Sequence, residues 1–202
     1  MICSRYSVVI YNNDYVKTLS RLNINKEIVN KNFDKFLKEY SLDNLKSKNA
    51  WWNMIEIEDP KNILVNVNIA EHMSNSIMVV TLFPRQSVNA HIDFSDNYAA
   101  INIPFANCND QTVTHFYEHP DNQTRFVCRD DFKLGARQLI DIDKLINTFS
   151  FSLTKYSVLF RPDKPHSISN NGDKVRIMLS WRFKPEYSWD QAVELCKNYH
   201  LM

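Results

Sequence analysis

The stretch from residue 165 to residue 183 constrains the fold more than any other part of the chain. Between residues 175 and 183 the side chains alternate with a period of two, which is the period of a β-strand. One face is continuously apolar and consists of Val175, Ile177, Leu179, Trp181 and Phe183. This strand is therefore predicted to lie in a sheet packed on a core. The other face carries Arg176, Met178, Ser180 and Arg182, and a buried arginine there requires water or an anion as its partner.

Other short, β-branched and apolar segments bounded by turn residues also predict strands. They cover residues 63–67, 76–83, 99–105, 112–117 and 156–160. Residues 118–154 are ambiguous, and residues 139–146 fit either a helix or a strand. Because many short strands occur without a βαβ rhythm, the pattern favours an antiparallel sandwich or barrel.

Helical signals occur at the two ends of the chain. Phe33, Phe36, Leu37 and Tyr40 are spaced as one apolar stripe, which predicts a helix within residues 14–48 that packs on the main body. Trp51 and Trp52 follow this segment and are interpreted as core anchors. Near the C-terminus, Ser188 with Gln191 forms a capping box. Trp189, Ala192, Val193 and Cys196 then define the buried face of a last helix.

Composition limits the class of protein. The chain has 202 residues, of which 44% are hydrophobic, and a formal net charge of +1. That length suits one domain, and the charge gives no sign of a nucleic-acid or membrane-surface binder. The four cysteines form no paired motif, which favours a reducing compartment. Because an arginine interrupts the apolar start and no stretch is long enough to span a bilayer, a soluble cytoplasmic protein is predicted.

Two histidines and one aspartate are the candidate chemical residues. His91 and Asp93 are two positions apart, which places them on one face of an extended segment. His166 stands at the boundary of another predicted strand. Two neutral imidazoles and one carboxylate are the ligands of the facial triad of non-heme Fe(II) oxygenases, which leaves three adjacent metal positions open. A lone histidine–aspartate pair is weak evidence, and a structural histidine is the alternative at either position.

The order His91-x-Asp93, His166 and then Arg176 ten residues later resembles the Fe(II)/2-oxoglutarate-dependent oxygenases. The similarity covers residues 83–183 and is closest to the aspartyl/asparaginyl β-hydroxylase and proline hydroxylase branch. It implies a mainly β fold, a double-stranded β-helix (jelly-roll or cupin-like) core with flanking N-terminal and C-terminal helices. The single domain 1–202 then divides into a mostly helical flank (1–60), the jelly-roll core (61–187) and a C-terminal helix (188–202).

The same resemblance implies roles for individual residues. His91, Asp93 and His166 would bind Fe(II), and Arg176 would pair with the distal carboxylate of the cosubstrate 2-oxoglutarate, with O2 as the oxidant. A forked, permanently charged donor suits a carboxylate. The implied reaction hydroxylates an unactivated C–H of an amino acid or a peptide or protein side chain, with succinate and CO2 as co-products. The expected partner is thus a small-molecule or peptide substrate, and the sequence does not indicate the oligomeric state.

Some positions depart from the family pattern. Certain members carry Arg-x-Ser in the last strand, whereas here Met178 takes the second position after Arg176 and Ser180 follows two later. Ser180 is kept as a candidate cosubstrate-binding residue. Asn102 is another, and the alternative is an asparagine that satisfies local backbone. Arg85 falls where many relatives have glycine, which would narrow the site.

The connection between His166 and Arg176 admits three geometries. A two-residue hairpin on Asn171-Gly172 would set His166 opposite Ile177 and point Arg176 away. A three-residue loop would set His166 opposite Arg176. A jelly-roll corner that carries the chain to the facing sheet would let both side chains point inward, and the predicted function requires one of the last two arrangements.

Two other functions remain open from the sequence. One is a cupin-like metalloprotein of another reaction class that does not use 2-oxoglutarate, and the other is a non-enzymatic jelly-roll binding protein. The remaining histidines add no site. His115 and His119 have the spacing of a zinc pair but lie on a predicted strand, so both are expected at the surface, and His72 and His200 are expected to be exposed.

Overall fold

The computed structural model describes residues 12–20, 22–25, 27, 28, 30, 31, 52–56, 62–64, 68–93, 98–120, 126–128, 137–139 and 142–202. The strands are β1 (Val16–Thr18), β2 (Trp52–Glu56), β3 (Met73–Leu82), β4 (Ser87–Ile92), β5 (Ala100–Ala106), β6 (Thr112–Glu118), β7 (Phe126–Cys128), β8 (Arg137–Leu139), β9 (Ile146–Ser152), β10 (Val158–Phe160), β11 (His166–Asn170) and β12 (Arg176–Phe183). The helices with assigned bounds are η2 (Ala70–His72) and η3 (Ile142–Lys144), which are short 3-10 turns, and α3 (Trp189–Asn198). Residues 27, 28, 30 and 31 of the N-terminal flank are also helical. The fold is therefore mainly β, as predicted.

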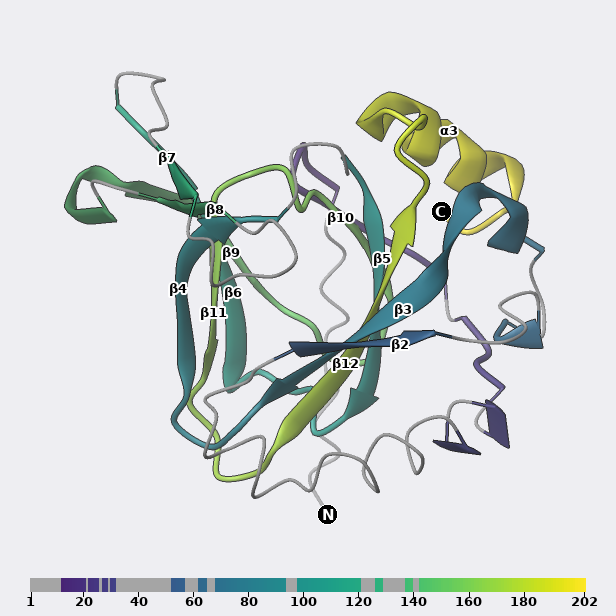
Figure 1. Ribbon diagram of the computed structural model, residues 1–202, viewed down its shortest axis with the longest axis horizontal. Helices are drawn as coiled ribbons and strands as arrows, with labels where there is room; N and C mark the ends of the chain where they lie inside the picture. Colours follow the sequence, from purple (N-terminus) through teal and green to yellow (C-terminus); the bar gives the residue numbers. More distant parts are fainter. Residues whose placement is uncertain are drawn as a thin grey trace, which may run out of the picture.

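The strands form two antiparallel sheets that face each other (Figure 1). One has the order β1-β10-β5-β12-β3-β2 and the other β7-β8-β4-β11-β6-β9. The chain crosses between the sheets on going from β3 to β4, from β4 to β5 and from β5 to β6, and again from β9 through to β12. Within them, the quartets β10-β5-β12-β3 and β4-β11-β6-β9 have the strand order of a jelly roll. The predicted double-stranded β-helix core is confirmed.

The corner between β11 and β12 decides among the three predicted geometries. β11 pairs with β4 and β6, whereas β12 pairs with β3 and β5, so the chain changes sheets between Asn170 and Arg176. Asn170 ties this corner together, because its amide donates to the main-chain oxygens of Leu82, Phe83 and Lys174 at 2.9–3.1 Å. The jelly-roll corner is therefore confirmed, and the two hairpin geometries are excluded.

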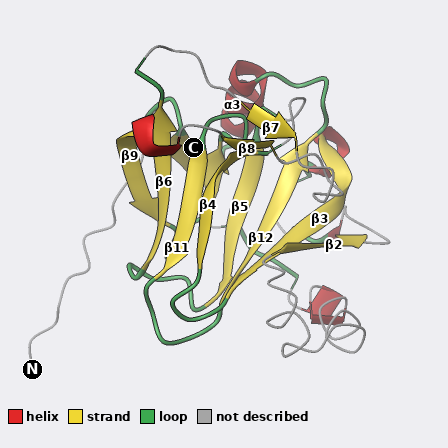
Figure 2. Ribbon diagram, turned by 60° about the vertical axis from the view of Figure 1, so that its left-hand side comes forward, coloured by secondary structure: helices red, strands yellow, loops and turns green. Residues whose placement is uncertain are grey.

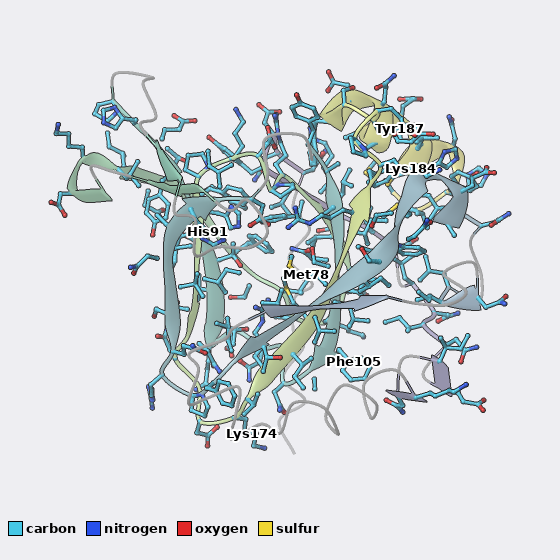
Figure 3. The ribbon with its side chains drawn as sticks, in the orientation of Figure 1. Met78, His91, Phe105, Lys174, Lys184 and Tyr187 are labelled. Carbon is cyan, nitrogen blue, oxygen red and sulfur yellow. The ribbon has the colours of Figure 1, made fainter. Side chains whose placement is uncertain are left out.

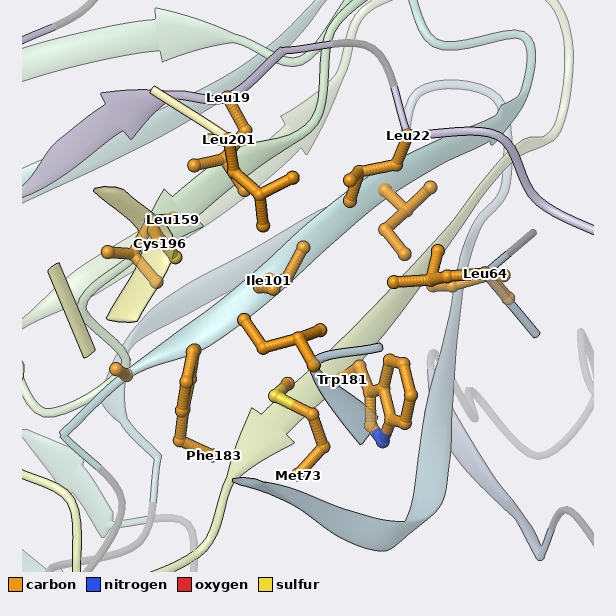
Figure 4. Packing of buried hydrophobic residues seen from close by; sticks show 14 of the residues in the cluster. Leu19, Leu22, Leu64, Met73, Ile101, Leu159, Trp181, Phe183, Cys196 and Leu201 are labelled. Carbon is orange, nitrogen blue, oxygen red and sulfur yellow. The ribbon is translucent and has the colours of Figure 1, made fainter. Parts of the chain in front are cut away.

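The central strand β12 is buried along its whole length. Its apolar face points out of the barrel and packs with the buried face of α3, and Figure 4 shows Trp181 and Phe183 in this cluster beside Met73 and Ile101. The indole nitrogen of Trp181 donates to the main-chain oxygen of Ser74 at 2.8 Å, so the buried N–H group has a hydrogen-bond partner. Truncating such a residue to alanine typically costs about 3–5 kcal/mol. The apolar face predicted for this strand is thus buried in a core that lies outside the barrel.

A second cluster lies between the sheets and fills one side of the barrel lumen. Its aromatic members Phe116, Phe151 and Phe160 pack on one another with ring centroids 5.2–6.3 Å apart. Phe116 and Phe151 come from one sheet, whereas Phe160, Met78, Val80 and Met178 come from the facing sheet. The two sheets can be followed from another side in Figure 2, where β6, β11 and β4 stand beside β5, β12 and β3. The polar members of the β12 inner face therefore lie in a lumen that is already apolar on one side.

The C-terminal helix begins as predicted. The Ser188 hydroxyl accepts from the main-chain nitrogen of Gln191, and the Gln191 side chain accepts from the main-chain nitrogen of Ser188. Trp189, Ala192, Val193 and Cys196 are its buried residues. No helix within the described ranges is long and apolar enough to cross a membrane.

The N-terminal flank differs from the predicted, mostly helical segment in two places, since Val16–Thr18 and Trp52–Glu56 are strands at opposite edges of one sheet. Several predicted features lie outside the described residues: the apolar stripe from Phe33 to Tyr40, Trp51 and the side chain of Trp52. Most of the strand predicted at residues 63–67 also lies outside them. Within the ambiguous region, Ile142–Lys144 forms a 3-10 turn and Ile146–Ser152 a strand. The division into a single domain of three parts stays a prediction.

Candidate metal centre

His91 and His166 lie on adjacent strands and directly opposite each other. β11 pairs with β4 in a register that matches His166 with His91, and the two imidazole centroids are 4.4 Å apart. Asp93 follows immediately after β4, where its main-chain nitrogen donates to the oxygen of Pro162 at 3.0 Å. The ends of two neighbouring strands and one adjoining loop therefore hold all three side chains. Figure 3 shows His91 on β4, on the side that faces the other sheet.

The three side chains converge on one point in the barrel. One ligand atom from each of His91, Asp93 and His166 lies within 4.8 Å of the others, and all three residues are buried. Among the described residues no other group of histidine, cysteine and acidic side chains with this geometry was found. The sequence-predicted triad is thus assembled in space, and its use as a metal site remains a prediction.

Hydrogen bonds orient both imidazoles in the same way. Nδ1 of His91 lies 2.8 Å from the main-chain oxygen of Asn89, and Nδ1 of His166 lies 2.8 Å from that of Lys164. A carbonyl only accepts, so each Nδ1 carries the proton and each Nε2 keeps a lone pair. Such contacts to the second ring nitrogen are what fix metal-binding histidines in proteins.

The ionisation states also suit a cation. Burial lowers the pKa of His166 to about 4, and the neighbouring His91 acts in the same direction, so the ring is neutral near pH 7. Phe160, whose ring meets His166 edge-on at 5.0 Å, supplies part of that apolar environment. Burial alone would raise the pKa of Asp93, but Arg182 and the contact with His91 outweigh it, and the pKa lies well below its usual value.

The donor set therefore fits a metal ion. Nε2 of His91 lies 3.4 Å from Oδ1 of Asp93, and both atoms carry lone pairs when the ring is neutral. Either a proton shared between the two atoms or a metal ion that both ligate can hold them this close in a buried site. Two imidazoles and one carboxylate are suitable ligands for Fe(II) and for other divalent transition metals.

Arg182 is a part of the site that the sequence interpretation missed. Its Nη2 donates to Oδ2 of Asp93 at 2.9 Å, and both side chains are buried. This contact holds one carboxylate oxygen and leaves Oδ1 facing the histidines. The available signal was the position of Arg182 on the same strand face as Arg176, but its partner stands 89 residues away in sequence.

Arg176 stands nearer the other end of the same strand face. It is 1% exposed, and its Nη2 lies 3.1 Å from the sulfur of Met178, two residues further along β12. The guanidinium therefore points along the strand toward the end where Asp93 lies. Among the described residues, neither Nε nor Nη1 of Arg176 has a hydrogen-bond partner. Burial lowers the pKa of this group, and an interaction with Cys108 opposes that change.

Asn102 and Ser180 lie between the two arginines. They are register partners on β5 and β12, and both are buried. Oδ1 of Asn102 has no hydrogen-bond partner among the described residues, so the alternative of an asparagine satisfied by local backbone does not account for this atom. The lumen thus presents a polar strip from the triad to Arg176.

Other predicted positions are placed elsewhere. Arg85 is exposed with φ 62° in the turn between β3 and β4, near the corner and away from the triad, so it does not narrow the site. Its left-handed backbone explains why a glycine suits this position. His119 is buried, contrary to expectation, and His115 is partly buried with Nδ1 2.8 Å from the hydroxyl of Ser150.

Of the last two histidines, one is partly buried and the other is exposed. His72 is not fully exposed, because its ring nitrogens meet the hydroxyls of Tyr187 and Tyr199 at 2.7 and 3.2 Å. His200 is exposed, as predicted.

Comparisons with known proteins give distant likenesses to solved structures. No family model matches the sequence, and the search of curated proteins gave no match. Among solved structures, AviO1 from Streptomyces viridochromogenes Tue57 is 11% identical with a TM-score of 0.45, over 86% of this chain and 91% of that one. E. coli ycfD is 13% identical with a TM-score of 0.36, over 61% of this chain and 28% of that one.

Oxalate decarboxylase from Bacillus subtilis, a protein with Mn(II) centres, is 14% identical with a TM-score of 0.33, over 56% of this chain and 22% of that one. This chain therefore spans less than a third of the length of either ycfD or the decarboxylase. Likenesses this distant carry no argument about activity. The fold rests on the strand order above, and the site rests on its own geometry.

Proposed function

We propose that this protein is an Fe(II)/2-oxoglutarate-dependent dioxygenase that hydroxylates an unactivated C–H. One observation carries the proposal: a buried His91, Asp93 and His166 cluster shares a lumen with Arg176, a buried arginine that lacks an anion among the described residues. A metal cluster alone is consistent with many cupin-like proteins. A metal cluster together with an unmatched guanidinium favours a metal-bound ligand that carries a second carboxylate.

The residues of this chain have distinct tasks in the proposed reaction. His91, His166 and Asp93 hold the metal from one side, and their Nδ1–carbonyl and Arg182 contacts keep the ligand atoms oriented before binding. Arg176 supplies two free donors to the distal carboxylate of 2-oxoglutarate. Asn102 and Ser180 line the path between them. Iron held by these three residues would supply the redox chemistry that couples oxidative decarboxylation of 2-oxoglutarate by O2 to hydroxylation of the substrate.

The lumen also contributes by excluding water. Phe116, Phe151 and Phe160 close the side of the barrel next to His166, so the reacting groups would meet in an apolar environment. Electrostatic interactions are stronger there than in water. An amino acid or a peptide or protein side chain remains the proposed substrate, and a cytoplasmic location remains part of the proposal.

The deciding experiment adds Fe(II) and then 2-oxoglutarate to the protein under anaerobic conditions and records the visible spectrum. We expect a weak charge-transfer band in the wild type, and we expect Arg176→Ala to require more 2-oxoglutarate to reach it. Absence of a band in both proteins would overturn the proposal. If Arg176→Ala needs no more 2-oxoglutarate than the wild type to reach the band, Arg176 does not anchor the cosubstrate.

A turnover assay tests the triad separately. His166→Ala or Asp93→Ala should abolish succinate formation, because each removes one of three ligands, while circular dichroism should report a retained β fold. Succinate formation that survives in either variant would contradict the ligand assignment. Metal that binds without any effect of 2-oxoglutarate would instead indicate a cupin-like protein of another reaction class, and failure to retain Fe(II) would indicate a non-enzymatic jelly roll.

A further inference from the structure

Cys108 belongs to the loop between β5 and β6, and its side chain contacts the start of β12. It is partly buried, and its thiol donates to the main-chain oxygen of Ile177 at 3.2 Å. Ile177 is the residue between Arg176 and Met178. The neighbouring residue Asn107 has φ 52° and donates from its side chain to the oxygen of Val175 at 2.7 Å, which ties this loop to the same end of the strand.

The sulfur of Cys108 adjoins the Arg176 guanidinium. Cys108 packs on the lumen cluster that contains Met178, and Met178 in turn contacts Nη2 of Arg176 at 3.1 Å. Burial lowers the pKa of Arg176, and an electrostatic interaction with Cys108 opposes that change. A thiol and two guanidinium nitrogens without partners among the described residues, Nε and Nη1, therefore border the same small region.

We propose that Cys108 is part of the wall of the anion pocket at Arg176, so that a carboxylate bound there and a modified Cys108 thiol exclude each other. The inference rests on the part of the proposed function that gives Arg176 a carboxylate ligand, and it does not depend on iron. The ligand class is a small dicarboxylate.

Two physical effects link the carboxylate to the reactivity of the thiol. A carboxylate on Nε and Nη1 covers the sulfur, and its negative charge disfavours the thiolate, which is the nucleophile. With iodoacetamide the sulfur forms a bond to the methylene carbon, the carbon–iodine bond breaks, iodide leaves and the thiol proton goes to solvent. The added carboxamidomethyl group then fills space beside Arg176.

The other cysteines serve as internal controls. Cys196 is fully buried in the cluster under α3, and burial raises its pKa to about 12, so it reacts slowly whatever is bound at Arg176. Its labelling reports only global opening of the fold. Cys3 lies outside the described residues, and the side chain of Cys128 is likewise not described. Peptide mass spectrometry separates both from Cys108.

The experiment measures the rate at which iodoacetamide labels Cys108 in the full chain under argon, without metal and again with Mn(II). Parallel samples contain 2-oxoglutarate, succinate, inorganic phosphate or the neutral dimethyl succinate at equal ionic strength. Calorimetry on the same samples reports whether 2-oxoglutarate binds. At a concentration about ten times its dissociation constant, a protecting anion should slow labelling about tenfold by mass action. Dimethyl succinate should have no effect, and Arg176→Met should abolish protection.

The possible outcomes separate this inference from the proposed function. Protection by 2-oxoglutarate or succinate that is lost in Arg176→Met supports both. Protection by phosphate alone supports the placement of Cys108 in the wall of the anion pocket and excludes 2-oxoglutarate as the ligand of that pocket. Bound 2-oxoglutarate with unchanged labelling of Cys108 overturns the inference and leaves the proposed function standing. Unchanged labelling with no binding of any anion overturns both, and this result needs only the wild-type protein.

Discussion

Arg176 and Arg182 stand on the same face of β12 and inside the same lumen, with exposures of 1% and 7%. Their surroundings differ. Arg182 donates to the Asp93 carboxylate at 2.9 Å, whereas Arg176 contacts the sulfur of Met178, interacts with Cys108 and, among the described residues, has two nitrogens without a hydrogen-bond partner. One arginine is therefore part of an internal ion pair, and the other is a donor with unused capacity.

The two arginines separate a contribution to stability from a contribution to ligand binding in this barrel. A buried charge with its partner is held in place, and removing either member leaves the other uncompensated. A buried charge without a partner costs folding free energy and gains its compensation only when a ligand binds. The chain itself therefore fixes the position of the Asp93 carboxylate, whereas Arg176 gains an anionic partner only when a ligand binds.

The sharpest test of this contrast is Arg182→Met measured in the metal-free protein. Loss of Arg182 leaves the buried Asp93 carboxylate without its cation, and breaking such a pair costs about 3–5 kcal/mol. Urea denaturation measures the change. In an Asp93→Asn background the same substitution should cost much less, because the amide carries no charge. An equal cost in both backgrounds would show that Arg182 acts through packing alone.

Arg176→Met should behave in the opposite way. It removes a buried cation without an anionic partner among the described residues, so the free energy of unfolding of the metal-free protein should stay the same or rise. Binding of 2-oxoglutarate to the Mn(II)-loaded protein should weaken by about 2–4 kcal/mol, roughly 30- to 1,000-fold. Arg176→Lys is the matched control, and it should be intermediate because it keeps the charge but not the fork. Destabilisation as large as that of Arg182→Met would contradict the contrast.

Acid should weaken the histidine end without involving Arg176. The folded-state pKa of His166 is about 4 against an ordinary value of 6.5, so between these values the unfolded chain binds more protons. Stability therefore rises with pH through this window, and lowering the pH from 6.5 to 4 should cost the metal-free protein about 3 kcal/mol from this group.

Urea titrations across that range measure the effect. The lowered pKa of Asp93 acts in the same direction at still lower pH, because stability that depends on the ionised carboxylate is lost as it takes up a proton. His166→Gln should flatten the slope between pH 6.5 and 4, whereas Arg176→Met should leave it unchanged. A slope that persists in His166→Gln would assign the acid sensitivity to other groups.

The alternation of β12 was sufficient to predict both faces of the strand, because a period of two fixes which side chains share a side. The sequence could not say which face lines the lumen. Ile177 and Trp181 look like a barrel interior, yet they face α3, and the interior face is the one with Arg176 and Ser180. The corner after Asn170 also stayed open, since the same loop length serves a hairpin or a change of sheet.

The triad followed from local spacing, but its supporting contacts did not. His91 and Asp93 are near neighbours in sequence, so their shared side could be predicted. The pairing of Arg182 with Asp93 depends on how β12 faces β4 across the barrel, which no local pattern encodes. The strand Val16–Thr18 was missed for a similar reason. Three residues form it only because β10 offers an edge to pair with.

Ser180 gives the smallest expected effect and the finest test of the contrast between the two arginines. It is buried midway along the lumen face, opposite Asn102 in the register of β5 and β12, and sequence alone left its role undecided. If its hydroxyl bonds the cosubstrate, Ser180→Ala should weaken 2-oxoglutarate binding by about 0.5–1.5 kcal/mol, roughly two- to tenfold, as one neutral hydrogen bond contributes. The stability of the metal-free protein should hardly change. Calorimetry measures the affinity and urea denaturation measures the stability.

Combined with Arg176→Met, the serine substitution should lose most of its effect on affinity, because a ligand that is no longer held at its distal end cannot keep the hydroxyl contact in register. Full additivity of the two substitutions would place Ser180 outside the polar strip that Arg176 serves.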